Sequence, residues 1–165
     1  MSFKEISPAE LREDHFDFWK KGLLLTAEAE GVTNTMTIGW GGIGVMWGKN
    51  VVFVVVRPER YTHGLMEKAE RFSVCAFTDE YKKELTLCGT VSGKDRNKFE
   101  ECAFTLKRDC DTPYIGEAKI ALLCKKLSAT PFFPEQISSE VDKWYGSHGG
   151  YHTIYIGEIE KILEK

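Results

Sequence analysis

The stretch VVFVVV, residues 51–56, followed by Arg57-Pro58, gives the clearest indication of the fold. Six consecutive apolar residues, five of them valine, predict a β-strand that is buried on both faces, as in the wall of a barrel. Pro58 has no N–H for a strand ladder, so it ends the strand.

Short predicted strands dominate the rest of the chain, and helices separate them. We expect further strands at residues 23–27, 33–40, 71–77, 119–129 and 152–163. We expect helices at residues 61–69, 81–87, 95–99 and 139–145, with a loop bracketed by Gly89 and Gly93. Strands and helices do not alternate regularly, which disfavours a doubly wound sheet. The pattern predicts a mainly β fold, a β-barrel with peripheral α-helices.

Composition narrows the class of protein. The chain has 165 residues, 42% hydrophobic and 28% charged, and we expect residues 1–165 to form one globular domain. A net charge of -3 shows no electrostatic footprint for nucleic acid. No apolar run approaches a membrane span, and the start MSFKEISPAELRED lacks the apolar segment of a signal peptide.

The cysteines and histidines indicate neither a disulfide framework nor a metal site. The five cysteines are an odd number without a CxxC pair, which fits free thiols in a reducing cytoplasm. The four histidines, at positions 15, 63, 148 and 152, have no metal-ligand spacing. The motifs GxGxxG, GxxxxGK[ST], GxSxG and HExxH are absent, so a standard dinucleotide fold, an NTPase and a hydrolase have no support.

Three segments could bind a ligand. Residues 34–41, NTMTIGWG, combine short polar side chains with a tryptophan, which suits a flat heteroaromatic ring, although a core strand with a buried tryptophan would look the same. Residues 56–62, VRPERYT, place an arginine before a helix start, which suits an anion, although a surface turn is the alternative. Residues 88–98, CGTVSGKDRNK, have the composition of a phosphate loop, or of a solvated turn before a charged helix.

The order of these segments resembles the flavin reductase-like, FMN-binding split-barrel family, especially its flavoredoxin branch. The resemblance runs through NTMTIGW, GxGVxW, VxVRPxRYT, FSV, CGxxSGKD and HTIYIGEI, and spans residues 22–163. No single motif is specific to this family, but the ordered set, with WGxxGVxW leading into VRPxRYT, is quite specific. The resemblance implies an FMN-binding split barrel.

The resemblance also implies the roles of individual residues. The flavin ring and ribityl chain would be bordered by Asn34, Thr35, Met36, Thr37 and Trp40. The phosphate end would be formed by Arg57, Tyr61 and Thr62, so that an Arg57→Ala variant would lose FMN. A loop closing over the ribityl and phosphate would comprise Cys88, Gly89, Ser92 and Gly93, with Lys98 as a phosphate ligand and His152 near the ring. For Cys88 the alternative is a small buried hydrophobic residue.

The implied function is an FMN-binding oxidoreductase that transfers electrons through bound flavin, with NADH or NADPH as the donor, in a homodimer whose flavin lies near the subunit interface. No catalytic side chain is expected, because the cofactor supplies the chemistry. The alternatives are a flavoredoxin-type electron carrier without a nicotinamide site, a non-catalytic flavin-binding protein, and a split barrel that holds pyridoxal phosphate or haem. The RPxRYT and CGxxSG elements favour FMN.

Overall fold

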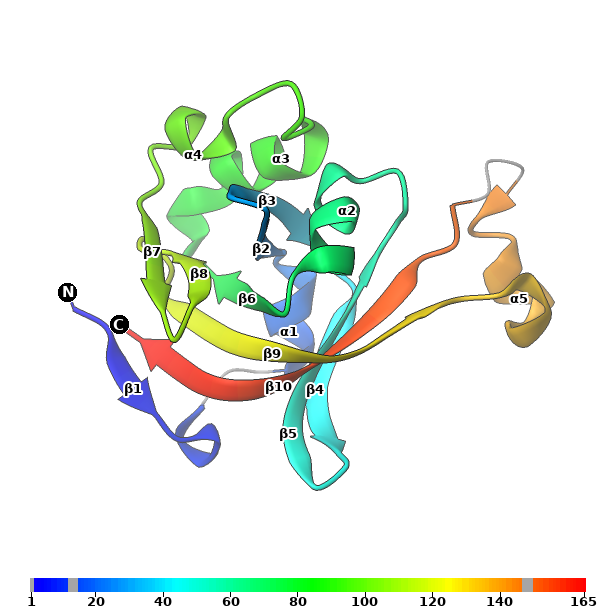
Figure 1. Ribbon diagram of the computed structural model, residues 1–165, viewed down its shortest axis with the longest axis horizontal. Coiled ribbons are helices and arrows are strands. Elements are labelled where there is room, and N and C mark those ends of the chain that lie inside the picture. The colour runs from blue at the N-terminus through cyan, green and yellow to red at the C-terminus, as the bar shows by residue number, and fades with distance from the viewer. Residues whose placement is uncertain (1, 12–14, 147–149) are drawn as a thin grey trace.

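The computed structural model describes residues 2–11, 15–146 and 150–165, and it is mainly β, as the sequence predicted (Figure 1). The main sheet has the order β3-β2-β6-β9-β10-β5-β4, β1 pairs with β10, and these strand pairs are all antiparallel. Its strands are β1 (Lys4–Ile6), β2 (Leu23–Ala29), β3 (Val32–Ile38), β4 (Gly41–Met46), β5 (Lys49–Val56), β6 (Arg71–Ala76), β9 (Ile120–Pro131) and β10 (Thr153–Glu164).

Helices and a small hairpin surround this sheet. The hairpin consists of β7 (Leu106–Asp109) and β8 (Thr112–Ile115), which the sequence pattern did not predict. The helices are α1 (His15–Lys20), α2 (Tyr61–Lys68), α3 (Lys82–Thr90), α4 (Lys98–Glu101) and α5 (Ser139–Asp142), with short 3-10 turns at Pro8–Glu10, Asp79–Tyr81 and Pro134–Gln136. Among the described residues no helix is long and apolar enough to cross a membrane.

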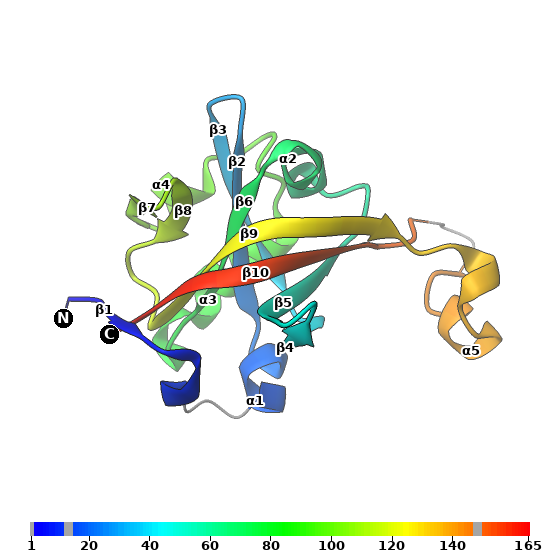
Figure 2. The same cartoon turned by 60° about the horizontal axis from the view of Figure 1, so that its bottom comes forward.

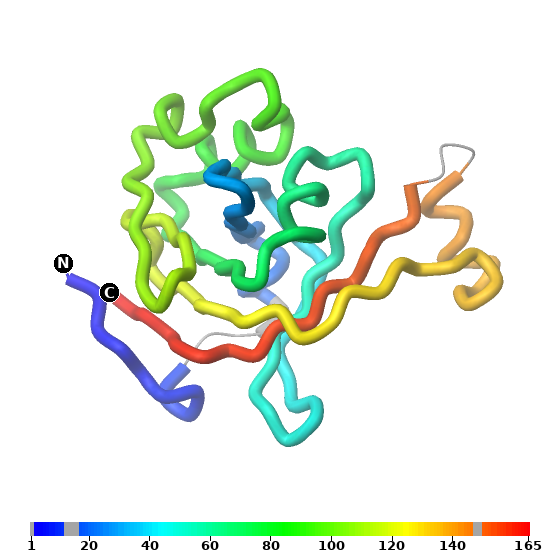
Figure 3. Tube along the Cα trace, in the orientation of Figure 1, coloured from blue at the N-terminus to red at the C-terminus, as the bar shows by residue number. Residues whose placement is uncertain are grey.

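The two longest strands, β9 and β10, run across the whole molecule and continue as an arm that carries α5 (Figures 1 and 2). β1 pairs with the last residues of β10, Lys4 opposite Glu164, so the two chain ends lie side by side (Figure 3). The β4–β5 hairpin projects away from α2 and α3 (Figure 1), while α1 packs against β4.

The sheet separates two hydrophobic clusters because side chains alternate along each strand. On β2, every second residue (Leu23, Leu25 and Ala27) faces the first cluster, which also contains Val54 and Phe72. Leu24, between Leu23 and Leu25 on the same strand, faces the second cluster, which packs under α3 and the β7–β8 hairpin. Gly157 of β10 allows Phe72 to approach closely, since a Cβ at this position would lie 2.6 Å from the Phe72 ring.

The expectation that residues 51–56 are buried on both faces is wrong in part. Val52, Val54 and Val56 are fully buried, but Phe53 is 38% exposed. The reason is the alternation of β5: Val52, Val54 and Val56 enter the first cluster, whereas Phe53 lies on the opposite face, which is covered only in part.

Two boundaries near the expected phosphate loop also differ. Gly89 does not start the loop, because α3 continues through Thr90, and the connecting segment is residues 91–97. The helix expected from Asp95 begins instead at Lys98, because the Asn97 side chain accepts hydrogen bonds from the N–H groups of Phe99 and Glu100 and caps the helix there.

Candidate functional site

Two adjoining cavities lie where β3 faces the loop after β5, the start of α2 and the segment after α3. The first, of about 190 Å³, is called here the aromatic cavity, and the second, of about 120 Å³, the polar cavity. They share Met36 and Arg60. The aromatic cavity is also lined by Thr37, Ile38, Gly39, Trp40, Val55, Arg57 and His152. The polar cavity is also lined by Asn34, Glu59, Tyr61, Thr62, Cys88, Thr90, Val91, Ser92, Gly93 and Lys98.

Rings dominate the aromatic cavity. The Trp40 ring lies 5.0 Å from that of His152 and 6.2 Å, edge to face, from that of Trp144 on the arm. Trp40 is 49% exposed, so it is not the buried core tryptophan that the sequence left open as an alternative. The Arg57 guanidinium lies 5.5 Å from the centre of the Tyr145 ring. Apolar faces and two cations, Arg57 and Arg60, therefore border the same space, an arrangement suited to a planar ring with polar edges.

His152 is held as a neutral imidazole. Its Nδ1 is hydrogen bonded to the Tyr145 hydroxyl at 2.9 Å, and it is only 9% exposed. Burial, the largest cause, together with the positive charge of Arg57 lowers the pKa of His152 to about 4. At neutral pH this side chain therefore contributes a hydrogen-bonding ring without a charge.

In the polar cavity, backbone and side chains from three elements converge. The Asn34 side-chain amide donates to the Thr62 hydroxyl at 2.9 Å, which joins β3 to α2. The Arg60 guanidinium donates to the Gly89 carbonyl at 3.2 Å, which joins the loop after β5 to α3. Gly93 packs against Asn34 so closely that a Cβ would lie 2.0 Å from the amide oxygen, so only glycine fits there.

Lys98 lies at the inner end of the polar cavity and is 3% exposed. Its Nζ donates to the carbonyl oxygens of Thr35 and Cys88, at 2.9 and 2.8 Å. Burial lowers the pKa of Lys98. An ammonium has three donors, and two are used by these carbonyls, so one N–H remains for a ligand.

The two cavities contain arginines that lack a carboxylate partner. Of the five arginines in the described part of the chain, Arg71, Arg96 and Arg108 each form an ion pair with a glutamate. No such pair involves Arg57 or Arg60 among the described residues, and both line the cavities. Guanidinium groups without a partner bind anions such as phosphate through forked, charge-assisted hydrogen bonds. The site is therefore electrostatically prepared for an anionic ligand.

Most residues predicted from the sequence line the two cavities; Thr35 and Gly89 do not, and Cys88 lines the polar cavity although its thiol points away from it. The Thr35 hydroxyl lies on the other face of β3, 3.1 Å from that of Thr26 and 3.2 Å from the Leu25 carbonyl. The Cys88 thiol faces the second hydrophobic cluster and is 1% exposed, which confirms its alternative role as a small buried residue. Gly89 does not line either cavity, although its carbonyl accepts from Arg60.

The residues expected at the phosphate end, Arg57, Tyr61 and Thr62, do not line the same cavity. Arg57 lines the aromatic cavity with Trp40 and His152, whereas Ser92 and Gly93 line the polar cavity. Arg60 spans both cavities, and sequence reasoning passed over it although it is the second arginine of the RPxRYT element. The other lining residues that were missed, Glu59, Thr90 and Val91 among them, had no chemical signal in the sequence.

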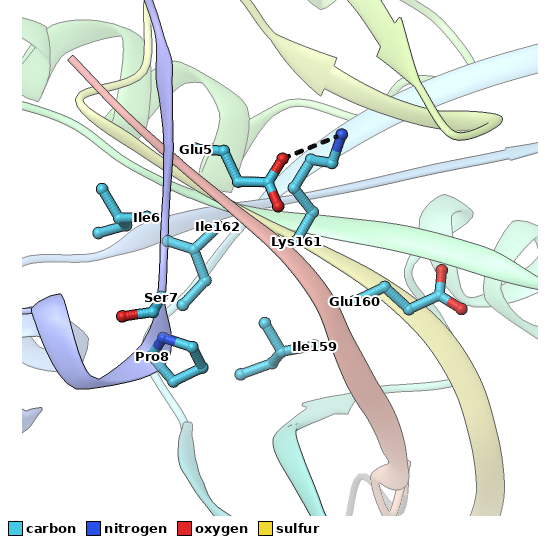
Figure 4. A pocket seen from close by; sticks show the side chains of 8 residues that line it. All are labelled: Glu5, Ile6, Ser7, Pro8, Ile159, Glu160, Lys161 and Ile162. Atoms are coloured by element: carbon cyan, nitrogen blue, oxygen red, sulfur yellow. Dashed lines mark ion pairs between the residues drawn. The ribbon is translucent and has the colours of Figure 1, made fainter.

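A larger cavity, of about 440 Å³, lies elsewhere, between β1 and β10 (Figure 4). It is lined by alternating apolar and charged side chains, with an ion pair of 3.5 Å between Glu5 and Lys161, and contains none of the predicted site residues. No group of three His, Cys, Asp or Glu residues in the described ranges is placed to hold a metal ion; His148 lies outside those ranges.

The low pKa of His152 predicts a pH-dependent stability. Because the folded protein keeps His152 neutral down to about pH 4, the unfolded chain binds the extra proton first as the pH falls below 6.5. The free energy of unfolding should therefore fall by up to about 3 kcal/mol between these pH values through this residue alone. Urea unfolding of the wild type and of His152→Gln at several pH values measures it, and an identical pH slope in both would contradict the assignment.

Comparison with known proteins places the chain in a family. Residues 20–165 match the family model of the flavin reductase like domain. An uncharacterised protein of Archaeoglobus fulgidus is 29% identical over 128 residues, which cover 76% of this chain and 62% of the relative. The chain thus spans less than two thirds of that relative.

Solved structures share the fold. A flavoredoxin from Methanosarcina acetivorans superposes with a TM-score of 0.71 at 23% identity, over 87% of this chain and 68% of the other. An FMN-binding protein from Thermus thermophilus gives 0.70 at 20% identity, over 87% and 71%. A protein from Shewanella frigidimarina with a split barrel domain gives 0.69 at 15% identity, over 88% and 67%. The β-rich fold is this split barrel, and the chain belongs to the flavin reductase-like family.

Proposed function

We propose that the protein binds FMN across the aromatic and polar cavities and transfers electrons through it as an NAD(P)H-dependent flavin oxidoreductase. The observation that carries the proposal is the pair of arginines, Arg57 and Arg60, that lack carboxylate partners in the described structure and line a cleft with rings at one end and hydroxyl groups at the other. Two structural neighbours support it: one is a flavoredoxin and the other an FMN-binding protein.

The donor set fits FMN in one orientation. The ring would occupy the aromatic cavity, against Met36, Trp40 and His152. The phosphate would occupy the polar cavity, where Arg60 and Ser92 offer donors. The walls of this cleft would be formed by Asn34, Thr37, Tyr61, Thr62 and Gly93. Thr35, Cys88 and Gly89 would act through their backbone carbonyls, which hold Lys98 and Arg60. Lys98 would contribute its one free N–H to the phosphate.

Bound FMN supplies the redox chemistry, since it accepts electrons in pairs or singly. The protein residues would set its position and its electrostatic surroundings. Arg57, at the ring end of the cleft, places a positive charge where negative charge accumulates on reduction, and so would favour the reduced state. Neutral His152 adds no charge of its own at this end. The arm that carries Trp144 and Tyr145 would limit access of water to the ring.

The two arginines should therefore separate in their effects. Arg60→Ala should raise the Kd of FMN by about 10- to 100-fold, because a charged hydrogen bond to phosphate is lost, and should leave riboflavin binding unchanged. Arg57→Ala should lower the flavin midpoint potential by about 20–40 mV, with a smaller effect on the Kd. Fluorescence titration and spectroelectrochemistry measure these effects.

Arg108→Ala is the matched control, because Arg108 pairs with Glu28 away from the cleft, and it should change neither quantity. Unchanged FMN affinity in Arg60→Ala would remove the phosphate assignment.

Nicotinamide use is tested by an anaerobic titration of the FMN-reconstituted protein with NADH and then NADPH, read by flavin absorbance. We expect bleaching by at least one nucleotide. Flavin that is reduced by dithionite but by neither nucleotide would instead indicate a flavoredoxin-type carrier or a non-catalytic flavin-binding protein. Turnover with a protein acceptor would distinguish these two, because only the carrier would show it. Failure to bind FMN would overturn the proposal, and the absorbance spectrum of the purified protein would identify another coloured ligand.

We also propose a homodimer, because large apolar side chains are exposed on the β4–β5 hairpin and beside the aromatic cavity. Val45 is 75% exposed, Trp47 62% and Trp144 71%. Groups of exposed apolar side chains of this kind mark interaction surfaces, and here one surface would adjoin the flavin.

Light scattering should therefore give twice the mass of the chain. Trp47→Asp should yield monomers, because it places a charge in the interface; aspartate tolerates the positive φ of this position. Val32→Asp, which alters an exposed valine at the β2–β3 turn, is the control and should remain dimeric. A monomeric wild type would reject the dimer.

A further inference from the structure

Two buried thiols lie in contact beneath the polar cavity. Cys88, near the end of α3, and Cys102, directly after α4, have their Sγ atoms 3.8 Å apart. Cys88 is 1% exposed and Cys102 is 9% exposed. No other pair of the five cysteines, all within the described ranges, has its sulfur atoms in hydrogen-bonding contact.

The pair lies at the two ends of the segment that closes the polar cavity. Residues 91–97 connect α3 to α4, and Ser92 and Gly93 of this segment line the cavity. Both cysteines are also hydrogen bonded to Lys98. The Lys98 Nζ donates to the Cys88 carbonyl at 2.8 Å, and the Cys102 N–H donates to the Lys98 carbonyl at 3.0 Å. A covalent bond between the sulfurs would therefore fix the base of this segment.

The surroundings distinguish the two thiols. Burial, the main cause, raises the pKa of both, that of Cys88 to about 12, and the hydrogen bond from Cys88 partly offsets the rise for Cys102. The charged groups that act on the pair are Glu84 and Lys98, with Glu101 acting on Cys102. Glu84, which has a buried carboxylate oxygen without a hydrogen-bond partner in the described structure, contributes through its charge to the raised pKa of both thiols. Cys102 is the more exposed of the two thiols, so peroxide reaches it first.

We propose that Cys88 and Cys102 form a reversible disulfide on exposure to hydrogen peroxide and thereby lock residues 91–97 over the polar cavity. The Cys102 sulfur attacks one peroxide oxygen, the O–O bond breaks, and Cys102 becomes a sulfenic acid while one water leaves. The Cys88 sulfur then attacks the Cys102 sulfur, the S–O bond breaks, and a second water leaves. Two thiols are oxidised by two electrons, and peroxide is reduced to two waters.

The geometry requires only a small movement for this step. The sulfur separation must shorten from 3.8 Å to about 2.05 Å, which side-chain rotation and a small helix shift can supply. Because both thiols are buried and their pKa values are raised, oxidation is slow at neutral pH and accelerates as the pH rises and the thiolate fraction increases.

The consequence for the cavity rests on the proposed FMN function. Gly93 lies against Asn34 beside a polar cavity of only about 120 Å³, so we expect residues 91–97 to move when flavin enters or leaves. A disulfide at the base of this segment would restrain that movement. FMN exchange should therefore slow several-fold in the oxidised protein.

The test uses the full chain with Cys110→Ser, which removes the exposed thiol. Peroxide treatment followed by intact mass spectrometry under non-reducing conditions should show loss of two hydrogen atoms, reversed by dithiothreitol. Peptide mapping should locate the bond between residues 88 and 102, and the rate should increase with pH. In Cys88→Ala the sulfenic acid should be trapped on Cys102 by dimedone, and Cys75→Ala should still form the disulfide.

Absence of the mass loss when a surface-thiol control is fully oxidised, or a bond mapped to another pair, overturns the disulfide. Stopped-flow release of FMN from reduced and oxidised protein tests the lock, and equal rates would reject that part. If neither state binds FMN, the proposed function fails, and the mass measurement still decides whether the disulfide forms.

Discussion

The antiparallel pairing of β9 with β10 is the interaction on which the rest of the structure depends. In the sheet order, β3, β2 and β6 lie on one side of this ladder and β5 and β4 on the other, so the ladder joins two halves that are distant in the sheet. Its curvature brings β3 back to the segment that follows β5, and the aromatic cavity is lined by residues of both. Gly157 and the irregular register beside it let Phe72 fill the interior at the point where the ladder bends.

The charge of the cleft arises because its two arginines, unlike the other arginines of the described structure, have no carboxylate partner. Arginines elsewhere in the described structure are paired with glutamates, while Arg57 and Arg60 face the cleft without such partners, and burial holds His152 neutral. The cleft therefore carries positive charge that a phosphate and a reduced flavin would neutralise. Beneath it, Lys98 donates to the carbonyls of Thr35 and Cys88, and the Cys88 thiol contacts that of Cys102, so the cleft and the two thiols share one set of contacts.

The fold was largely predictable because its signals are local. Alternating and continuous runs of β-branched residues predicted most strands, including β5 and β10, from short-range preference alone. β4 and the β7–β8 hairpin were not predicted, because glycine-rich and charged segments adopt strands only when a neighbouring strand supplies the ladder. α4 begins at Lys98 and not at Asp95, as the composition predicted, because the Asn97 side chain caps the helix there.

For the site, the sequence by itself determined which kinds of side chain are available and, through the order of its motifs, the family to which the chain belongs. Only the tertiary structure decided which of them meet. Alternation along β3 turns the Thr35 hydroxyl away from the cleft, while Asn34 and Met36 line it. The course of the loop after β5 places Arg57 in the aromatic cavity alone and Arg60 at the border of both cavities. The contact between Cys88 and Cys102 arises from the packing of α3 against the end of α4. Such contacts join residues far apart in the chain, and their geometry depends on how the elements pack.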